Sequence, residues 1–327
     1  LGINVPGGFA ITSSAFNEFI SNSKIDKEIS KELANLNVEN LSDLRRAGKK
    51  IRGLILKTPL PQNLTSEIQQ AWLDVSESGK SFAVRSSATA EDLPDASFAG
   101  QQETFLNING FDNLIDAVRK VYASLFTDRA ISYRRLRNFK GSLSISVGVQ
   151  EMVRSDIGAS GVAFTLDTES GYRGSIFITS SYGLGEGIVQ GTVNPDEFYV
   201  FKEALEKNDF PIIKKSLGEK AKKMIFADNN LPGKSVKYIR VPKKETNKFS
   251  LTNSEIIELA KCAKTIEDHY KVPMDIEWAK DGKDKKIYIL QARPETVQSK
   301  VSNYFERYTL KEKGELIVSG KSVGQKI

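Results

Sequence analysis

The sequence predicts an α+β protein built from two lobes. Its first 80 residues have the apolar spacing of amphipathic helices, whereas alternation with a period of two dominates after residue 143. The chain has 327 residues, which is more than one hydrophobic core commonly organises. We therefore expect a helix-rich amino-terminal part followed by antiparallel-sheet lobes.

Helices are predicted wherever capping residues precede an apolar stripe. In the first half of the chain they follow residues 12–14, span 25–36, 41–56 and 64–75, and continue after Asp112 to residue 138 with a break near Thr127. In the second half, Thr252 and Glu255 form a Thr-x-x-Glu capping box that opens a core-facing helix ending at Tyr270.

Strands are predicted where apolar and polar residues alternate between Gly, Ser or Asp boundaries. The segments with this pattern are 143–153, 161–166, 175–182 and 196–202. Two further strands, 274–279 and 287–293, flank the turn residues 282–285. These last two strands are expected to form a hairpin.

Composition excludes several classes of protein. Hydrophobic residues make up 39% and charged residues 27% of the chain, and no apolar run approaches the roughly 18 residues of a membrane span. The net charge is +6, but the lysines are scattered, so we expect neither a membrane nor a nucleic-acid partner. The single cysteine, Cys262, excludes an intrachain disulfide and favours a reducing, cytoplasmic location.

Arg85 is the first candidate for chemistry. It lies in a strand-like segment, directly before the hydroxyl-bearing residues 86–89 and a small-residue loop that ends at Gly100. A guanidinium at a strand end, beside hydroxyl and backbone N–H groups, suits a phosphate-bearing ligand. Gly100 permits a close backbone approach. A structural salt bridge for Arg85 and an ordinary turn at Gly100 remain alternatives.

The hairpin is the second candidate. Side chains two apart in a strand share a face, so Asp275 and Glu277 point one way. Gln291 and Arg293 do the same on the partner strand. Hard oxygen ligands beside a cation suit Mg²⁺ bound to nucleotide phosphates. A surface cross-strand ion pair, worth about 0.2 to 1 kcal/mol, explains the same spacing.

Other sequence patterns give weaker indications of catalysis or ligand binding. The glycines of 183–187 do not complete a dinucleotide fingerprint, because Ile188 occupies the position of the third glycine. The lone His269 lies near a helix C-terminus, where a structural role is usual. Cys262 lies within a helix without a paired base and is interpreted as an inert, buried thiol. The basic run 214–223 is interpreted equally well as a solvated face or as part of a cleft wall.

Residues 82–108 resemble, almost residue for residue, the nucleotide-binding domain of the phosphoenolpyruvate synthase (pyruvate, water dikinase) family. Four further segments also resemble this family, namely 152–171, 182–200, 272–282 and 289–297. The resemblance implies a two-lobed ATP-grasp fold of the pyruvate phosphate dikinase amino-terminal type. It implies one lobe over 1–190, a second over 191–298, and the start of a phosphohistidine domain in 299–327.

The resemblance also implies ligands and residue roles. ATP and Mg²⁺ are the implied ligands, with Mg²⁺ on Glu277 and Gln291, and with Arg85 and Arg293 as catalytic cations on the phosphates. The other implied nucleotide-binding residues are Ser97, Gly100 and Gln101 in a mobile loop, Gln150, Met152 and Val153 in an adenine-binding hinge, and Glu186 near the ribose or the cleft. Core packing explains the apolar hinge residues equally well.

In the resembled family, ATP gives its β-phosphoryl group to a histidine on a swivelling domain, AMP and phosphate leave, and pyruvate is phosphorylated at a third domain. The sequence contains neither that phosphocarrier histidine nor the lysine segment expected upstream of Leu1, so it is expected to lie inside a longer, gluconeogenic protein. A homo-oligomer of the full-length enzyme is compatible with this reading. The alternatives are a phosphotransferase of the rifampin-inactivating type and a non-catalytic nucleotide-binding module.

Overall fold

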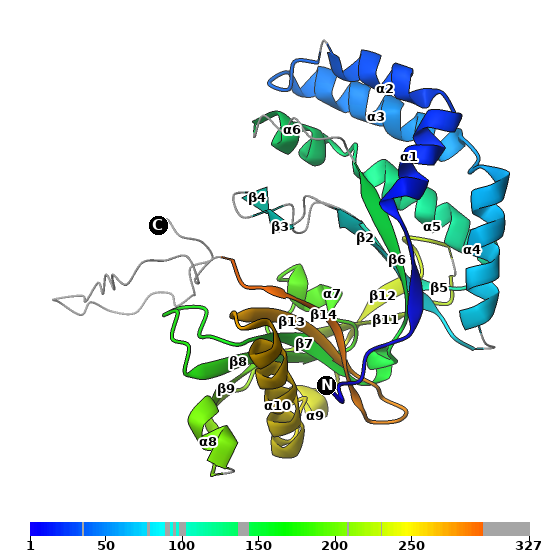
Figure 1. Ribbon diagram of the computed structural model, residues 1–327. Helices are drawn as coiled ribbons and strands as arrows, with labels where there is room; N and C mark the ends of the chain where they lie inside the picture. Colours follow the sequence, from blue (N-terminus) through cyan, green and yellow to red (C-terminus); the bar gives the residue numbers. More distant parts are fainter. Residues whose placement is uncertain are drawn as a thin grey trace.

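The computed structural model describes residues 1–34, 36–76, 79–88, 92–93, 96–97, 103–136, 144–207, 209–229 and 231–296. Helices and antiparallel sheets together confirm the predicted α+β class (Figure 1). The helices are α1 (Ser13–Asn22), α2 (Ile25–Ala34), α3 (Leu41–Lys57), α4 (Gln62–Val75), α5 (Phe111–Ser124), α6 (Asp128–Leu136), η1 (Ser155–Ile157), α7 (Glu186–Val189), α8 (Lys202–Lys207), α9 (Lys243–Thr246) and α10 (Asn253–Tyr270). The strands are β1 (Gly8–Ile11), β2 (Phe82–Ala88), β3 (Asp92–Leu93), β4 (Ala96–Ser97), β5 (Thr104–Ile108), β6 (Ile145–Glu151), β7 (Ala159–Phe164), β8 (Ser175–Tyr182), β9 (Asp196–Phe201), β10 (Ile212–Ser216), β11 (Lys222–Phe226), β12 (Val236–Arg240), β13 (Met274–Lys280) and β14 (Ile287–Pro294).

The first sheet has the strand order β1-β6-β2-β5 and packs against the amino-terminal helices. Its core contains Val84 of β2 beside Ile51 and Tyr122 of the helices, and all three side chains have no exposed surface. The helices predicted in this part of the chain are present. The predicted break near Thr127 is confirmed, because it lies between the end of α5 and the start of α6.

The second sheet has six strands in the order β10-β9-β8-β7-β13-β14. Figure 1 shows α10 on the face of this sheet that points away from the first sheet. Ile276 and Trp278 of β13 and Ile256 of α10 meet in this second core. The predicted capping box opens α10, since Thr252 accepts a hydrogen bond from the Glu255 N–H and the Glu255 carboxylate accepts one from the Thr252 N–H.

The change from the first core to the second lies between Val149 and Ala159. The lobe boundary expected at residue 190 falls inside the six-stranded sheet, because β8 pairs with β7 on one side and with β9 on the other. Alternation marks strands but not the sheet to which they belong. The position of the boundary is therefore corrected to the segment around η1.

A two-stranded ribbon, formed by β11 and β12, connects the part of the protein that contains the six-stranded sheet with the first sheet. Near its tip, the buried Ser235 donates a hydrogen bond to the Leu106 carbonyl at 2.6 Å and accepts one from the Asn107 side chain at 3.0 Å. Lys120 donates to the Pro232 carbonyl at 3.1 Å. The ribbon therefore fastens to β5, the outer strand of the first sheet.

Some expectations cannot be followed in the structure. Gly100, Gln101 and residues 299–327 lie outside the described residues, and Ser97 is described only as part of the backbone of β4. None of the described helices combines the length and the apolar composition that a bilayer crossing requires.

Candidate active site

A cavity of about 610 Å³ lies between the two sheets. Residues 6–10, 85–87 and 148–150 line it from the first sheet and the segment leading into β1, and residues 290–293 line it from β14. Four residues predicted from the sequence meet here: Arg85, Gln150, Gln291 and Arg293. The fold thus gathers side chains that are more than 200 positions apart in the chain.

Arg85 reaches the cavity because β2 and β6 hold its backbone, with Gly148 directly opposite. The Arg85 side chain passes over Gly148, where an added β-carbon would make an ordinary contact at 3.5 Å. The guanidinium lies 3.9 Å from the Glu277 carboxylate of the second sheet. Their side chains are 25% and 31% exposed, so this long ion pair is partly shielded from water.

The hairpin that the sequence predicts is present as β13 and β14. Asp275 lies opposite Arg293, and Glu277 lies opposite Gln291. Arg293 donates two hydrogen bonds to one Asp275 oxygen, at 2.8 and 2.9 Å. The cross-strand ion pair weighed as an alternative therefore exists, but it involves Asp275 and leaves Glu277 to face Gln291 and Arg85.

The donor set fits Mg²⁺ bound together with phosphates, and not a metal held by protein alone. Within the described ranges, no three His, Cys, Asp or Glu side chains group closely enough to hold a metal ion. Glu277 and Gln291 offer one carboxylate and one amide oxygen from directly opposed positions. Mg²⁺ commonly takes only one or two carboxylates from protein and completes its shell with phosphate and water oxygens.

Comparison with known proteins agrees with this geometry. Residues 1–313 match the family model described as pyruvate phosphate dikinase, AMP/ATP-binding domain. The chain belongs to this family. A phosphoenolpyruvate synthase of Neisseria meningitidis serogroup B is 54% identical over 333 residues, and one of Escherichia coli K12 is 50% identical over 330 residues; each alignment covers 100% of this chain and 42% of the relative. A probable phosphoenolpyruvate synthase of Pyrococcus horikoshii is 38% identical over 360 residues, covering 98% of this chain and 42% of the relative.

This member of the pyruvate phosphate dikinase AMP/ATP-binding family thus spans less than half the length of these relatives. The match confirms an AMP/ATP-binding domain.

The segment 150–153 predicted as an adenine hinge in this family is only partly open to a ligand. The Met152 N–H donates to the Ser81 carbonyl at 2.8 Å, and Val153 is 7% exposed. Neither residue lines the cavity, whereas Gln150 does. The Gln150 side chain donates to the Leu290 carbonyl of β14 at 3.3 Å.

Glu186 begins α7 and lies outside the cavity lining. Burial raises its pKa above the ordinary carboxyl value, and its carboxylate accepts a hydrogen bond from Gln190 at 2.7 Å. The turn before it is structural at Gly183, where φ is +86° and an added β-carbon would lie 2.5 Å from the Met224 carbonyl oxygen.

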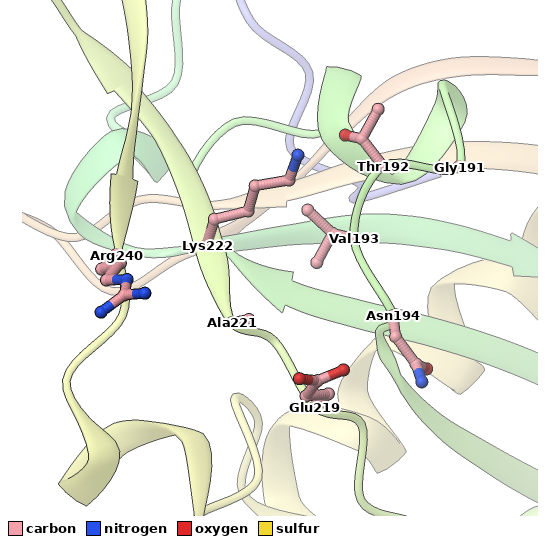
Figure 2. Close-up of a pocket in the computed structure, with 8 residues that line it drawn as sticks. All are labelled: Gly191, Thr192, Val193, Asn194, Glu219, Ala221, Lys222 and Arg240. Carbon is pink, nitrogen blue, oxygen red and sulfur yellow. The ribbon is translucent and has the colours of Figure 1, made fainter.

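A second pocket, of about 480 Å³, lies between the β11–β12 ribbon and the loop after α7 (Figure 2). Figure 2 shows Lys222 extending toward Thr192, with Arg240 at the opposite margin. The basic run 214–223 contributes Glu219, Ala221 and Lys222 to this pocket and no residue to the lining of the first cavity. Among the predicted site residues that the structure describes, none lines the second pocket.

The structure agrees with the non-catalytic roles predicted for His269 and Cys262. His269 is exposed in the last turn of α10, with its ring edge-on to Tyr270. Cys262 is half-buried on the same helix, and burial raises the pKa of its thiol, as expected of an unreactive cysteine.

Sequence reasoning missed two contributions to the site. Residues 6–10 line the cavity, and Gly8 permits this because an added β-carbon would lie 2.1 Å from the Val149 carbonyl oxygen. The adjacent glycines Gly7 and Gly8 were the available signal. The second is Leu290, whose role depends on strand register and leaves no mark in the sequence pattern.

Proposed function

We propose that this chain is the ATP-binding, phosphoryl-donating part of a phosphoenolpyruvate synthase (pyruvate, water dikinase). The observation that carries the proposal is the convergence of Arg85, Glu277, Gln291 and Arg293 beside one cavity between two sheets. The names of the aligned relatives support the reaction, which converts ATP, pyruvate and water to AMP, phosphoenolpyruvate and phosphate. Pyruvate and the acceptor histidine belong to parts of the protein outside this chain.

The roles of the side chains follow from the needs of phosphoryl transfer, which are positioning and charge neutralisation rather than a nucleophile from this domain. Arg85 and Arg293 bind and orient phosphate oxygens. Glu277 and Gln291 are the proposed ligands of Mg²⁺, which neutralises phosphate charge when it is bound. Arg293 is itself fixed by its two bonds to Asp275, so its guanidinium is oriented before a ligand arrives.

Two antiparallel sheets with the cavity between them support the proposal of an ATP-grasp fold. In this reading the lobes meet near η1, and residues 299–327 enter the phosphohistidine domain. Ser97, Gly100 and Gln101 remain proposed members of the loop that closes over the phosphates. Met152, Val153 and Glu186 remain proposed nucleotide contacts, although the Met152 N–H would have to exchange its present partner.

The nucleotide product tests the proposal. Incubation of the full-length protein with ATP, Mg²⁺ and pyruvate should yield AMP and phosphate, because the β-phosphoryl group leaves with the acceptor. Chromatography of the nucleotides measures this directly. ADP as the sole nucleotide product would contradict the proposal.

The same assay separates the alternatives. AMP formation that depends on rifampin and not on pyruvate would identify a phosphotransferase of the rifampin-inactivating type. Binding of Mg²⁺–ATP without any turnover in the full-length protein would identify a non-catalytic nucleotide-binding module.

A further inference from the structure

A one-residue bulge in β14 sets which side chains face Glu277. Trp278 lies opposite Ile289, and Glu277 lies opposite Gln291, so Leu290 between them opposes no residue of β13. A bulge of this kind shifts the register by one, and a shift of one exchanges the two faces of a strand. Without it, Leu290 would oppose Glu277. Gln291 and Arg293 would then point to the opposite face of the sheet.

The outer edge of β14 is held by residues from the amino-terminal side of the cavity. Asn4 makes two hydrogen bonds to the backbone of β14. Its carbonyl accepts one from the Ile289 N–H at 2.9 Å, and its side chain donates one to the Ile287 carbonyl at 3.1 Å. Directly after Ile289, the carbonyl of the bulged Leu290 accepts a hydrogen bond from the Gln150 amide at 3.3 Å. Asn4 and Gln150 thus hold three backbone groups of β14 between Ile287 and the bulged Leu290.

Gln150 is well placed to act as a fixed support. Its backbone lies in β6 of the first sheet, opposite Gly8 on one side and Ala83 on the other. Its side chain is half-buried. A bulged residue lies outside the regular ladder of hydrogen bonds, and an unpaired buried carbonyl costs free energy.

We propose that Gln150 is a positioning residue. Its amide holds the Leu290 carbonyl in the bulge and thereby keeps Gln291 and Arg293 on the face of Glu277. The hydrogen bond also joins the two sheets. The register of β14, which carries the proposed metal ligand Gln291 and the proposed phosphate ligand Arg293, therefore depends on the relative position of the two sheets. The consequence for nucleotide binding rests on the function proposed above.

The test replaces Gln150 with methionine in the full-length protein, which keeps the length of the side chain and removes the donor. Hydrogen exchange of the ligand-free protein should rise about tenfold for the amides of β14, because one supporting hydrogen bond is lost. Titration with a non-hydrolysable ATP analogue should show that the affinity gained from Mg²⁺ falls about tenfold. The metal-free affinity should change by less than about twofold, because the two hydrogen bonds to Asp275 hold Arg293 in place, whereas Gln291 depends on the bulge.

Three controls make the test specific. Gln70→Met makes the same change on the exposed face of α4 and should alter neither readout. Gln150→Glu, whose carboxylate cannot donate to the Leu290 carbonyl, should reproduce Gln150→Met. The double variant Gln150→Met/Gln291→Met should bind no more weakly than Gln291→Met alone.

Three results would overturn the proposal: unchanged exchange in β14, equal losses with and without Mg²⁺, or independent effects of Gln150 and Gln291 on affinity. Equal losses would mean that Gln150 touches the nucleotide itself. If the wild-type protein showed no Mg²⁺-dependent binding, the proposed function would fail instead. The exchange of β14 would then decide the role of Gln150 by itself.

Discussion

Replacement of Glu277 by alanine should abolish Mg²⁺-dependent phosphoryl transfer in the full-length protein while leaving the fold intact. Glu277 is the carboxylate that faces Gln291 and lies 3.9 Å from the Arg85 guanidinium. Asp275, by contrast, lies opposite Arg293 and accepts two hydrogen bonds from that guanidinium. Loss of the charge should therefore remove the metal ligand, and the rate of AMP formation at saturating Mg²⁺ measures the effect.

Two further variants show whether the charge is what matters. Glu277→Gln keeps the shape and should be nearly as inactive as Glu277→Ala. Glu258→Ala, an exposed position on α10 behind the same sheet, should keep wild-type activity and the same unfolding midpoint. A wild-type rate in Glu277→Ala would remove the assignment of the metal site.

The second large effect is expected for stability, at the buried pair of Asp196 and Lys220. Neither side chain has any exposed surface, and the Lys220 ammonium donates to the Asp196 carboxylate and to the Gly218 carbonyl at 2.9 Å. Asp196 also accepts from the Gly218 N–H at 2.9 Å and from the backbone and hydroxyl of Ser250 at 2.8 and 2.7 Å. The carboxylate thus fixes the loop before the β11–β12 ribbon.

Asp196→Asn should lower the free energy of unfolding by about 3 to 5 kcal/mol, because the change leaves a buried ammonium without its counterion. Urea denaturation measures the loss. Lys220→Met should cost less, since Asp196 keeps the N–H and hydroxyl donors of Gly218 and Ser250.

Asp268→Asn is the matched control for Asp196→Asn. Asp268 pairs with Lys264 on the surface of α10, and its loss should cost no more than about 0.5 kcal/mol. The double variant Asp196→Asn/Lys220→Met should be more stable than Asp196→Asn alone. A loss below about 1 kcal/mol in Asp196→Asn would show that the pair does not support the loop as described.

Much of the fold follows from local patterns. The helices α1 to α6 and α10, and strands β2, β6 to β9, β13 and β14, lie where apolar spacing and capping residues predict them. The short strands β1, β5, β10, β11 and β12 are not predicted, because their stability comes from neighbours distant in sequence. The ribbon is an example, since the buried Ser235 near its tip is held by Leu106 and Asn107 of β5.

In the site, too, the features set by local sequence pattern can be predicted and those set by distant neighbours cannot. Alternation along the hairpin correctly places Asp275 and Glu277 on one face of their strand, and Gln291 and Arg293 on one face of the partner strand. The pairing of Asp275 with Arg293 and of Glu277 with Gln291 is known only from the structure. The bulge at Leu290 and its support by Gln150 could not be predicted, because one extra residue in a strand changes no local propensity. The place of Gln150 in an adenine hinge stays a prediction, and the hydrogen bond from its side chain to β14 is a separate finding of the structure.

Isothermal titration with a non-hydrolysable ATP analogue, with and without Mg²⁺, tests the nucleotide site most directly when wild type is compared with Arg85→Ala. Arg85 lines the cavity in the first sheet and faces Glu277 of the second, so binding across both sheets requires it. We expect Mg²⁺-dependent binding in the wild type and a loss of about 10- to 150-fold in Arg85→Ala, the range for one charge-assisted contact. Equal affinities of the two proteins would contradict a nucleotide bound between the sheets.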